Sequence, residues 1–269
     1  MNQESFFENA VILTGASRGI GRQLAFQLAE QGAWLSLAAR SAEELQQVAE
    51  DCLSRGGRVL AIQTDVSIQS QCDTLVQSTV NEYGRIDTLI NNAGITMWAS
   101  FDELETLSPL EKIIQTNYLG SVYCTYYALP YLKATKGRIV GISSVAGKTG
   151  VPKRSGYAAS KHAMTGFFDT LRIELEETGV SVTMIYPDFV ATNTRKLAFG
   201  PDGQPLMKSR VREGEVMSAE TCARLVIDAV TKRKREAILS TRGKLGQWFR
   251  LISPSTVDRI ARRAIEKGR

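Results

Sequence analysis

A tyrosine and a lysine four positions apart, Tyr157 and Lys161, are the residues whose types and spacing best suit proton transfer. On a helix, residues at i and i+4 lie one turn apart on the same face. A free tyrosine has a pKa of about 10 and gives little phenolate at neutral pH. A neighbouring ammonium stabilises the phenolate and lowers that pKa toward the range where acid–base catalysis is efficient. The pair therefore predicts a proton donor or acceptor at Tyr157.

Other residue types that often carry chemistry are sparse. The single histidine, His162, follows Lys161 directly, and adjacent helical residues point about 100° apart, so we expect it to serve packing or an interface. The four cysteines form no C-x-x-C pair and have no companion histidines. The sequence therefore predicts neither a disulfide framework nor a metal site.

A glycine-rich turn, Thr14-Gly15-Ala16-Ser17-Arg18-Gly19-Ile20-Gly21, follows the first predicted strand and opens into a helix. Backbone N–H groups and the helix dipole at such a turn can bind a pyrophosphate. The spacing departs from G-x-G-x-x-G, and glycines also serve ordinary tight turns. The turn alone is therefore a weak indication of a dinucleotide site.

The end of the second predicted strand, Leu35-Ser36-Leu37-Ala38-Ala39-Arg40-Ser41, bears on the choice of dinucleotide. An acidic residue there would pair with the ribose hydroxyls of NAD, and none is present. Arg18 and Arg40 can instead flank a 2′-phosphate with forked, charge-assisted hydrogen bonds. This favours NADP(H), while the alternative is that both arginines are merely solvated.

Further motifs follow in a fixed order: Asp65-Val66, Asn91-Asn92-Ala93-Gly94, Ser143-Ser144 and Tyr157-x-x-x-Lys161. Together with the glycine-rich turn they resemble the short-chain dehydrogenase/reductase family over residues 10 to about 192. The resemblance implies that Ser144 polarises the substrate oxygen, that Asn117 supports a water bound to Lys161, and that Lys161 also bonds the nicotinamide ribose. Ser143 is then structural.

The resemblance also implies cofactor contacts along the chain. The expected cofactor-binding residues are Gly15, Ser17, Arg18, Gly19, Ile20, Gly21, Arg40, Asp65, Val66, Asn91, Ala93, Gly94, Tyr157, Lys161, Pro187, Val190 and Thr192. One position departs from the family pattern, because Pro187-Asp188 stands where Pro-Gly is usual. Two interpretations of Asp188 stay open: a carboxylate near the nicotinamide or the substrate mouth, or a side chain that points to solvent.

Short β-branched runs alternate with longer segments of helical period, which predicts one Rossmann-type doubly wound α/β domain around a seven-stranded parallel sheet. The predicted strands are 10–13, 34–38, 59–63, 88–91, 137–142, 181–186 and 237–240, and the predicted helices are 20–31, 42–55, 68–83, 107–134, 156–177 and 219–233. We expect a catalytic domain over 1–241 and a basic amphipathic tail over 242–269.

The segment 193–217 is rich in glycine and proline and is expected to form a functional loop over the carboxyl edge of the sheet. With 95–101 and 146–155 it would wall the substrate pocket. These walls mix apolar side chains such as Trp98 and Phe199 with Lys153, Arg154 and Arg195. The composition favours a mostly apolar carbonyl or alcohol substrate, without identifying it.

The charge of this 269-residue chain is uneven: residues 232–269 hold 12 Lys and Arg against 3 Asp and Glu, which is +9, and the rest sums to −4. The tail interleaves arginines with aromatic and aliphatic residues, a composition typical of interfacial membrane helices. The alternative is a tail packed on its own domain or on a neighbouring subunit. No secretory signal or long apolar run is evident, and the body shows no nucleic-acid footprint, so we expect a cytoplasmic protein, with peripheral membrane contact left open.

Two other functions share some of these features. A dinucleotide-binding sensor or scaffold would not need Asn117, Ser144, Tyr157 and Lys161 together. A nucleotide-sugar epimerase or dehydratase also has Tyr-x-x-x-Lys, but usually with G-x-x-G-x-x-G and a larger carboxyl-terminal domain. The sequence favours an NADP(H)-dependent oxidoreductase that interconverts a carbonyl and an alcohol, and the resemblance implies a homodimer or homotetramer.

Overall fold

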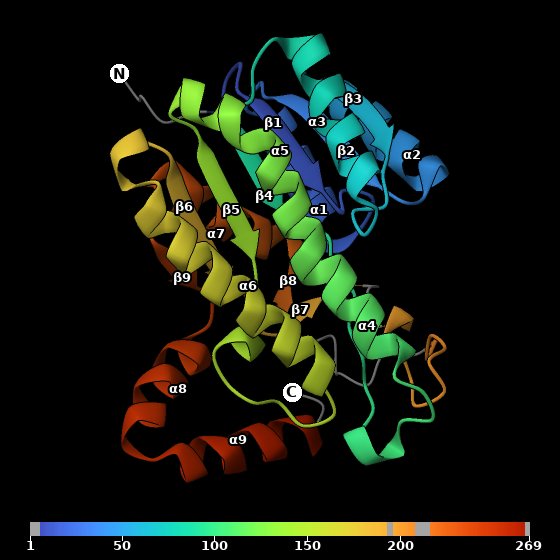
Figure 1. Ribbon diagram of the computed structural model, residues 1–269, viewed down its shortest axis with the longest axis vertical. Coiled ribbons are helices and arrows are strands. Elements are labelled where there is room, and N and C mark those ends of the chain that lie inside the picture. The colour runs from blue at the N-terminus through green and yellow to red at the C-terminus, as the bar shows by residue number, and fades with distance from the viewer. Residues whose placement is uncertain (1–5, 193–195, 208–215, 267–269) are drawn as a thin grey trace.

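The computed structural model describes residues 6–192, 196–207 and 216–266. Its centre is one sheet of seven parallel strands in the order β3-β2-β1-β4-β5-β6-β9 (Figure 1). The strands are β1 Ala10–Thr14, β2 Trp34–Ala39, β3 Arg58–Gln63, β4 Thr88–Asn91, β5 Arg138–Ile142, β6 Ser181–Tyr186 and β9 Glu236–Ile238. The predicted seven-stranded parallel sheet is confirmed.

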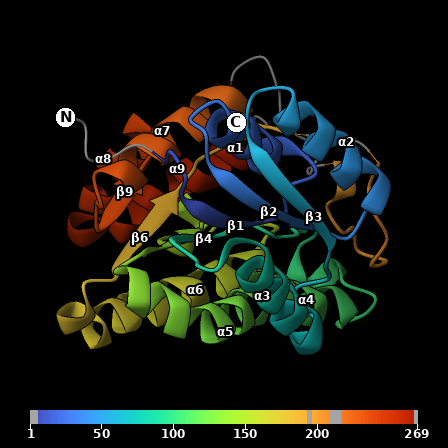
Figure 2. The same cartoon turned by 90° about the horizontal axis from the view of Figure 1, so that it is seen from above.

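Helices cover both faces of this sheet, as Figure 2 shows. One layer holds α1 Gly19–Ala29, α2 Ala42–Leu53 and α7 Ala219–Thr231, and the other holds α3 Gln69–Tyr83, α5 Gly120–Thr135 and α6 Ser155–Glu174. Alternate residues of β1 enter different cores, because side chains along a strand point to opposite faces. Val11 and Leu13 pack in one core and Ile12 in the other. β1 is therefore apolar on both faces.

The helix predicted over 107–134 is built in three parts. It runs from α4 Ser108–Ile114 through a π-helical segment, η2 Gln115–Leu119, into α5. Such segments inside α-helices often occur at functional sites. Here the segment contains Asn117, which is fully buried.

The predicted helix over 156–177 ends earlier than expected, since α6 stops at Glu174. A short 3₁₀ turn, η4 Glu176–Thr178, follows it. Gly179 then takes a left-handed conformation with φ of 77°, which glycine adopts without the steric cost that other residues meet. The predicted end was wrong because the helical pattern continues through the 3₁₀ turn.

A second, two-stranded parallel sheet was not predicted. It pairs β7 Val190–Ala191 with β8 Met217–Ser218 and so closes the base of the loop over 193–217. Parts of that loop, 193–195 and 208–215, lie outside the described residues. In the described part, Phe199 pairs with Met97 and Pro205 through isolated bridges, which fixes this segment beside the apolar cluster around Met97.

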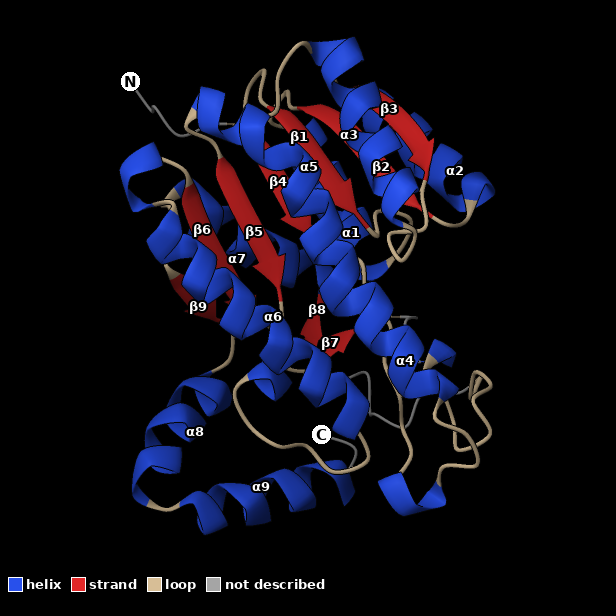
Figure 3. Cartoon of the chain, in the orientation of Figure 1, coloured by secondary structure: helices blue, strands red, loops and turns tan. Residues whose placement is uncertain are grey.

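Two helices follow the last strand, α8 Thr241–Ile252 and α9 Pro254–Glu266. Ser240 caps α8 by accepting a hydrogen bond from the Gly243 N–H. Figure 3 shows both helices beyond the carboxyl ends of β5, β6 and β9, where they form a hook below the sheet. In the described part of the chain no helix is both long and apolar enough to cross a bilayer.

Candidate active site

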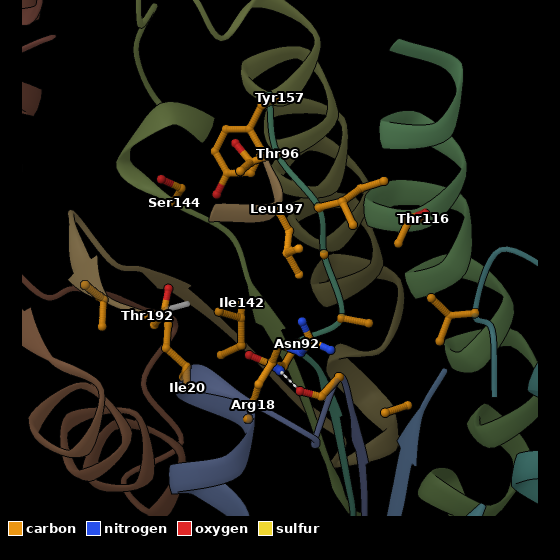
Figure 4. Close-up of a pocket in the computed structure, with 18 of the residues that line it drawn as sticks. Arg18, Ile20, Asn92, Thr96, Thr116, Ile142, Ser144, Tyr157, Thr192 and Leu197 are labelled. Atoms are coloured by element: carbon orange, nitrogen blue, oxygen red, sulfur yellow. Dashed lines mark hydrogen bonds between the residues drawn. The ribbon is translucent and has the colours of Figure 1, made fainter. Parts of the chain in front are cut away.

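Most of the predicted site residues line one cavity of about 460 Å³ at the carboxyl ends of the central strands (Figure 4). They are Gly15, Ser17, Arg18, Ile20, Gly21, Arg40, Asp65, Val66, Ala93, Gly94, Ser144, Tyr157, Lys161, Pro187, Val190 and Thr192. Parallel sheets bind ligands at this edge. Gly19, Asn91 and Asn117 do not line the cavity, and Asn91 and Asn117 are buried.

The glycine-rich turn leaves the start of α1 open to an anion. No side chain caps this helix, and its first turn holds no acidic residue. Gly15 has a φ of 67°, and a Cβ on Gly21 would come within 2.1 Å of the Gly15 carbonyl oxygen. The backbone N–H groups at this end therefore remain available to a diphosphate, in agreement with the dinucleotide-binding prediction.

The segment around Asn92 fixes the position of this turn. The Asn92 side-chain amide donates to the carbonyl oxygens of Thr14 and Gly15 at 2.9 and 3.1 Å. The Thr14 hydroxyl accepts hydrogen bonds from the backbone N–H groups of Asn92 and Ala93. The loop after β4 thus holds the phosphate turn against the sheet. Thr14 and Asn92 were missing from the predicted site because their role depends on this contact between distant segments.

The two arginines predicted to recognise a 2′-phosphate lie at one end of the cavity. Arg18 makes a salt bridge of 2.6 Å with Glu44, and both side chains are well exposed. An exposed ion pair of this kind contributes little free energy, so an incoming phosphate can compete for Arg18. Arg40 is exposed at the end of β2.

The proton-transfer residues meet at the other end of the cavity. Lys161 is buried, and its Nζ donates to the Ile142 carbonyl oxygen at 2.8 Å and lies 5.8 Å from the Tyr157 ring centroid. Ser144 is the residue before the 3₁₀ turn η3 Val145–Gly147, and its hydroxyl accepts from the Ala146 N–H. Figure 4 shows Ser144 and Tyr157 at the same cavity, with Thr96 and Leu197 beside them.

Asn117 acts on the position of the tyrosine helix. Its side-chain amide donates to the Ile95 carbonyl oxygen and to the Ser160 hydroxyl, and its Oδ1 accepts from the Ile95 N–H. Ser160 in turn donates to the Tyr157 carbonyl oxygen at 2.8 Å. These bonds tie the loop after β4 to the first turn of α6. Ser160 was missed because nothing in its spacing distinguishes it.

Asn91 and Asp65 are also held by neighbours. The Asn91 amide donates to the Thr125 hydroxyl inside the protein, and Asn91 is 1% exposed. The Asp65 carboxylate accepts hydrogen bonds from the backbone and the hydroxyl of Ser67. Asn91 therefore supports the sheet under the cavity, while Asp65 lines the cavity itself.

Asp188 lines the cavity, which agrees with the first of the two interpretations left open by the sequence, but its carboxylate is already bound by other residues. Its carboxylate makes a salt bridge of 2.8 Å with Arg242 and accepts a hydrogen bond from Ser240. The side chain is only 13% exposed, so it does not point to solvent. The residue that replaces the usual glycine thus connects the cavity wall to the start of α8.

His162 contacts the backbone of its own helix. Its Nδ1 lies 2.9 Å from the Ala158 carbonyl oxygen one helical turn earlier, and the residue is exposed on α6. It does not line the cavity. The described residues contain no group of three or more His, Cys, Asp or Glu side chains suited to a metal ion.

Burial lowers the pKa of Lys161 from its ordinary value to about 7. The unfolded chain therefore binds more protons than the folded chain between about pH 7 and the ordinary lysine pKa of about 10.4. The contribution of Lys161 to the free energy of unfolding therefore rises with pH across that window. The reason is that the lysine is already largely neutral in the folded state, while in the unfolded chain it loses its proton only near the upper end of the window.

We expect the free energy of unfolding of Lys161→Met at pH 7 to exceed that of the wild type by an amount on the order of a few kcal/mol. Each pKa unit by which burial lowers the pKa of the lysine corresponds to about 1.4 kcal/mol. The difference should shrink as the pH rises toward 10. Urea unfolding of both proteins without dinucleotide measures it. Because all other titrating groups are common to both proteins, a difference that does not change with pH would contradict the lowered pKa of Lys161.

Known proteins agree with this picture. Residues 9–200 match the family model described as short chain dehydrogenase, and the chain belongs to that family. It is 39% identical over 248 residues to the 11-beta-hydroxysteroid dehydrogenase-like protein 4A of Arabidopsis thaliana, covering 91% of this chain and 80% of that protein. It is 36% identical over 255 residues to an 11-beta-hydroxysteroid dehydrogenase of Pinus massoniana, covering 92% and 71%.

Two solved structures share the fold. A short-chain dehydrogenase/reductase from Burkholderia phymatum in complex with NAD superposes with a TM-score of 0.84 at 23% identity, covering 94% of this chain and 96% of that one. An alcohol dehydrogenase from Thermococcus sibiricus complexed with 5-hydroxy-NADP gives 0.73 at 24% identity, covering 85% and 94%. The chain is thus an oxidoreductase of a family that binds nicotinamide dinucleotides and acts on alcohol or carbonyl groups.

Proposed function

We propose that this protein is an NADP(H)-dependent oxidoreductase that interconverts a carbonyl and an alcohol on a mostly apolar substrate, with Tyr157 as general acid and base. The observation that carries the proposal is the meeting of Ser144, Tyr157 and Lys161 in one cavity. The uncapped start of α1 opens into the same cavity. An NADPH-consumption screen over ketones and aldehydes is the direct test.

The dinucleotide, when bound, supplies or accepts the hydride; Gly15, Ser17, Arg18, Ile20 and Gly21 would hold its phosphates. In the direction of reduction, the Ser144 hydroxyl donates a hydrogen bond to the substrate oxygen and Tyr157 donates the proton to it. Lys161, in its charged form, stabilises the phenolate that remains. In the direction of oxidation, Tyr157 takes the proton back.

The 2′-phosphate preference rests on Arg18 and Arg40 together with the absence of an acidic residue at the end of β2. We expect the double variant Arg18→Ser, Arg40→Ser to raise KM for NADPH about tenfold to a hundredfold, because a hydrogen bond to a charged group contributes about 1.5–3 kcal/mol and these side chains are partly screened by water. KM for NADH should change little. Initial rates with both cofactors measure the effect, and a wild type that prefers NADH would refute the assignment.

An apolar substrate is supported by Ile95, Leu197 and Phe199, which line the cavity together with Tyr157. Ile95 and Phe199 pack against an apolar cluster that contains Met97 and Ile113 and lies behind the lining. The relatives named hydroxysteroid dehydrogenases suggest a bulky apolar alcohol or ketone as the substrate class. Met207, an expected pocket wall, is 72% exposed instead.

We also propose that residues 1–241 form the catalytic domain of a cytoplasmic homodimer or homotetramer and that the basic tail, 242–269, makes peripheral contact with membrane. Five apolar side chains of α8 are at least half exposed, namely Leu245, Trp248, Phe249, Leu251 and Ile252. Basic residues of the tail would favour anionic lipid.

We expect the full chain to sediment with anionic liposomes several-fold more than Trp248→Ser, Leu251→Ser, since these two changes remove exposed apolar area without altering charge. The same pair compared on neutral liposomes separates the apolar contribution from the electrostatic one. Equal partitioning of both proteins on anionic vesicles would contradict membrane contact.

A further inference from the structure

A second cavity of about 520 Å³ lies under the carboxyl-terminal helices. We call it the tail cavity; α8 and α9 form one side of it and the segment 144–151 forms part of the other. Its lining is mostly apolar and includes Val151, Leu245, Phe249, Val257 and Ile265. Figure 3 shows the position of α8 and α9 below the sheet.

The tail cavity shares a wall with the active-site cavity. Four residues line both: Ser144, Arg154, Asp188 and Phe189. One of the proton-transfer residues, Ser144, therefore stands between the two cavities. A ligand that occupies the tail cavity lies next to the reacting groups.

Arg154 is the unusual member of this shared wall. The residue is only 8% exposed, and its guanidinium carbon lies 4.9 Å from the Trp98 ring centroid, 5.5 Å from that of Tyr157 and 5.3 Å from that of Phe189. Its Nε is buried and donates to no acceptor. Among the described residues its guanidinium makes no salt bridge, so a buried cation is held by aromatic faces alone.

The other cations of the tail cavity all have partners. Lys148 makes a salt bridge of 2.7 Å with Glu236, and Arg250 donates to the Lys148 carbonyl oxygen. The nearby carboxylate of Asp188 is bound by Arg242 through both of its oxygens. The carboxylate near Arg154 in the described part of the chain, that of Asp188, is thus already engaged by another arginine.

A buried cation without an anion is costly, because its solvation is lost and no charge replaces it. Desolvation by burial lowers the pKa of Arg154, and the nearby Tyr157 and Asp188 offset this only in part. A ligand anion at the guanidinium would remove the cost and satisfy the buried Nε. Arginine is well suited to this, because its planar donors match the two oxygens of a carboxylate.

We propose that Arg154 binds the carboxylate of an apolar acid whose hydrocarbon body lies in the tail cavity, so that the substrates are oxo or hydroxy acids with an extended apolar part. The proposal rests on the proposed function for the reaction itself. Since Arg154 lies against the Tyr157 ring, the carboxylate is a few bonds from the reacting carbon. A neutral ketone of the same shape has no carboxylate to pair with the Arg154 guanidinium.

Binding of unreactive ligands tests this without turnover. The probes are dodecanoate and its methyl ester, measured by titration calorimetry on the wild type, Arg154→Met and Arg259→Met. Dodecanoate should bind the wild type more tightly than the ester does. Arg154→Met should weaken the binding of dodecanoate about tenfold to a hundredfold, as expected for a charge-assisted hydrogen bond, and leave the affinity for the ester within about twofold. Arg259→Met removes an exposed cation of α9 that does not line the cavity and should leave both affinities nearly unchanged.

The proposal would be overturned if the wild type bound dodecanoate and its ester with equal affinity. It would also be overturned if Arg154→Met lowered the affinity for both ligands equally, because that result would indicate a structural role for the stacked guanidinium. If Arg154→Met does not fold, Arg154→Lys is used; it keeps the charge but not the planar fork, and it should retain part of the preference for the acid. Tyr157→Phe should still bind dodecanoate, so that a failure of catalysis and a failure of this site give different results.

A kinetic arm uses 3-oxododecanoate and its methyl ester as substrates with NADPH. Arg154→Met should raise KM for the acid at least tenfold while the ester changes little. If Arg154 instead acted only by lowering the pKa of Tyr157, both substrates would lose kcat together and the pH profile would move. That outcome would overturn the assignment of Arg154 to substrate binding.

Discussion

Tyr157→Phe is expected to lower kcat/KM about a thousandfold for any ketone that the wild type reduces with NADPH. The change removes one hydroxyl and leaves the ring that packs near Arg154 and Lys161. A positioned proton donor contributes about 10²–10⁴ in rate, and among the residues that the structure describes no second phenol or imidazole lines this cavity to replace it. Steady-state rates of NADPH oxidation give the loss directly.

Two controls isolate the hydroxyl. Tyr118→Phe removes a phenol from the segment η2, where Tyr118 packs edge-on against Phe167 and does not line the cavity, and it should keep most of the activity. Binding of NADPH to Tyr157→Phe should also persist, since the phosphate-binding turn is untouched. A Tyr157→Phe protein that turns over at the wild-type rate would refute the proposed acid–base role.

The sheet was predictable because its strands are short runs rich in β-branched and apolar residues that alternate with helical segments. β4 and β6 were predicted with the observed limits, and nearly all of their residues are buried. The pair β7 and β8 was not, because it joins two dipeptides that are far apart in sequence. A run of two residues is too short to show an alternating apolar pattern, so the pairing of β7 with β8 becomes visible only in the folded structure.

The candidate site also has a part that could be predicted from the sequence and a part that could not. Tyr157 and Lys161 were predictable because their spacing places them on one face of a helix, and the structure puts both at the cavity. The salt bridge between Asp188 and Arg242 was not, because it joins the end of β6 to a helix beyond the sheet. Sequence reasoning also named Arg154 as a pocket wall but gave no sign that its guanidinium lacks a partner. Such facts depend on what surrounds a side chain in space.

This salt bridge links the two proposals. The usual glycine at position 188 would leave Arg242 without its acceptor and the start of α8 without its anchor to the cavity wall. With Asp188 bound by Arg242, α8 is anchored over the tail cavity, and Asp188 offsets the desolvation of the Arg154 cation only in part. Asp188, which stands where the family usually has glycine, therefore occurs together with the apolar tail cavity and with the buried Arg154 cation.

Ser144→Ala is the second change with a large expected effect, a loss of about 10²–10³ in kcat, as for other single donors that stabilise a developing oxyanion. The loss should fall on kcat more than on KM, because the hydrogen bond strengthens as charge develops on the substrate oxygen. Ser144→Thr retains the hydroxyl and should recover part of the rate.

The neighbouring serine is the matched control. The Ser143 hydroxyl donates to the Lys161 carbonyl oxygen at 3.3 Å and is buried, so Ser143→Ala removes a similar group from the same wall without removing a donor to the substrate. It should cost stability and little kcat. Ser144 also caps η3, so thermal unfolding of Ser144→Ala must be compared with that of Ser143→Ala. If the two variants lose stability equally but only Ser144→Ala loses kcat, the hydroxyl acts on the reaction; equal losses of kcat would assign both serines to the scaffold and leave Tyr157 as the only donor.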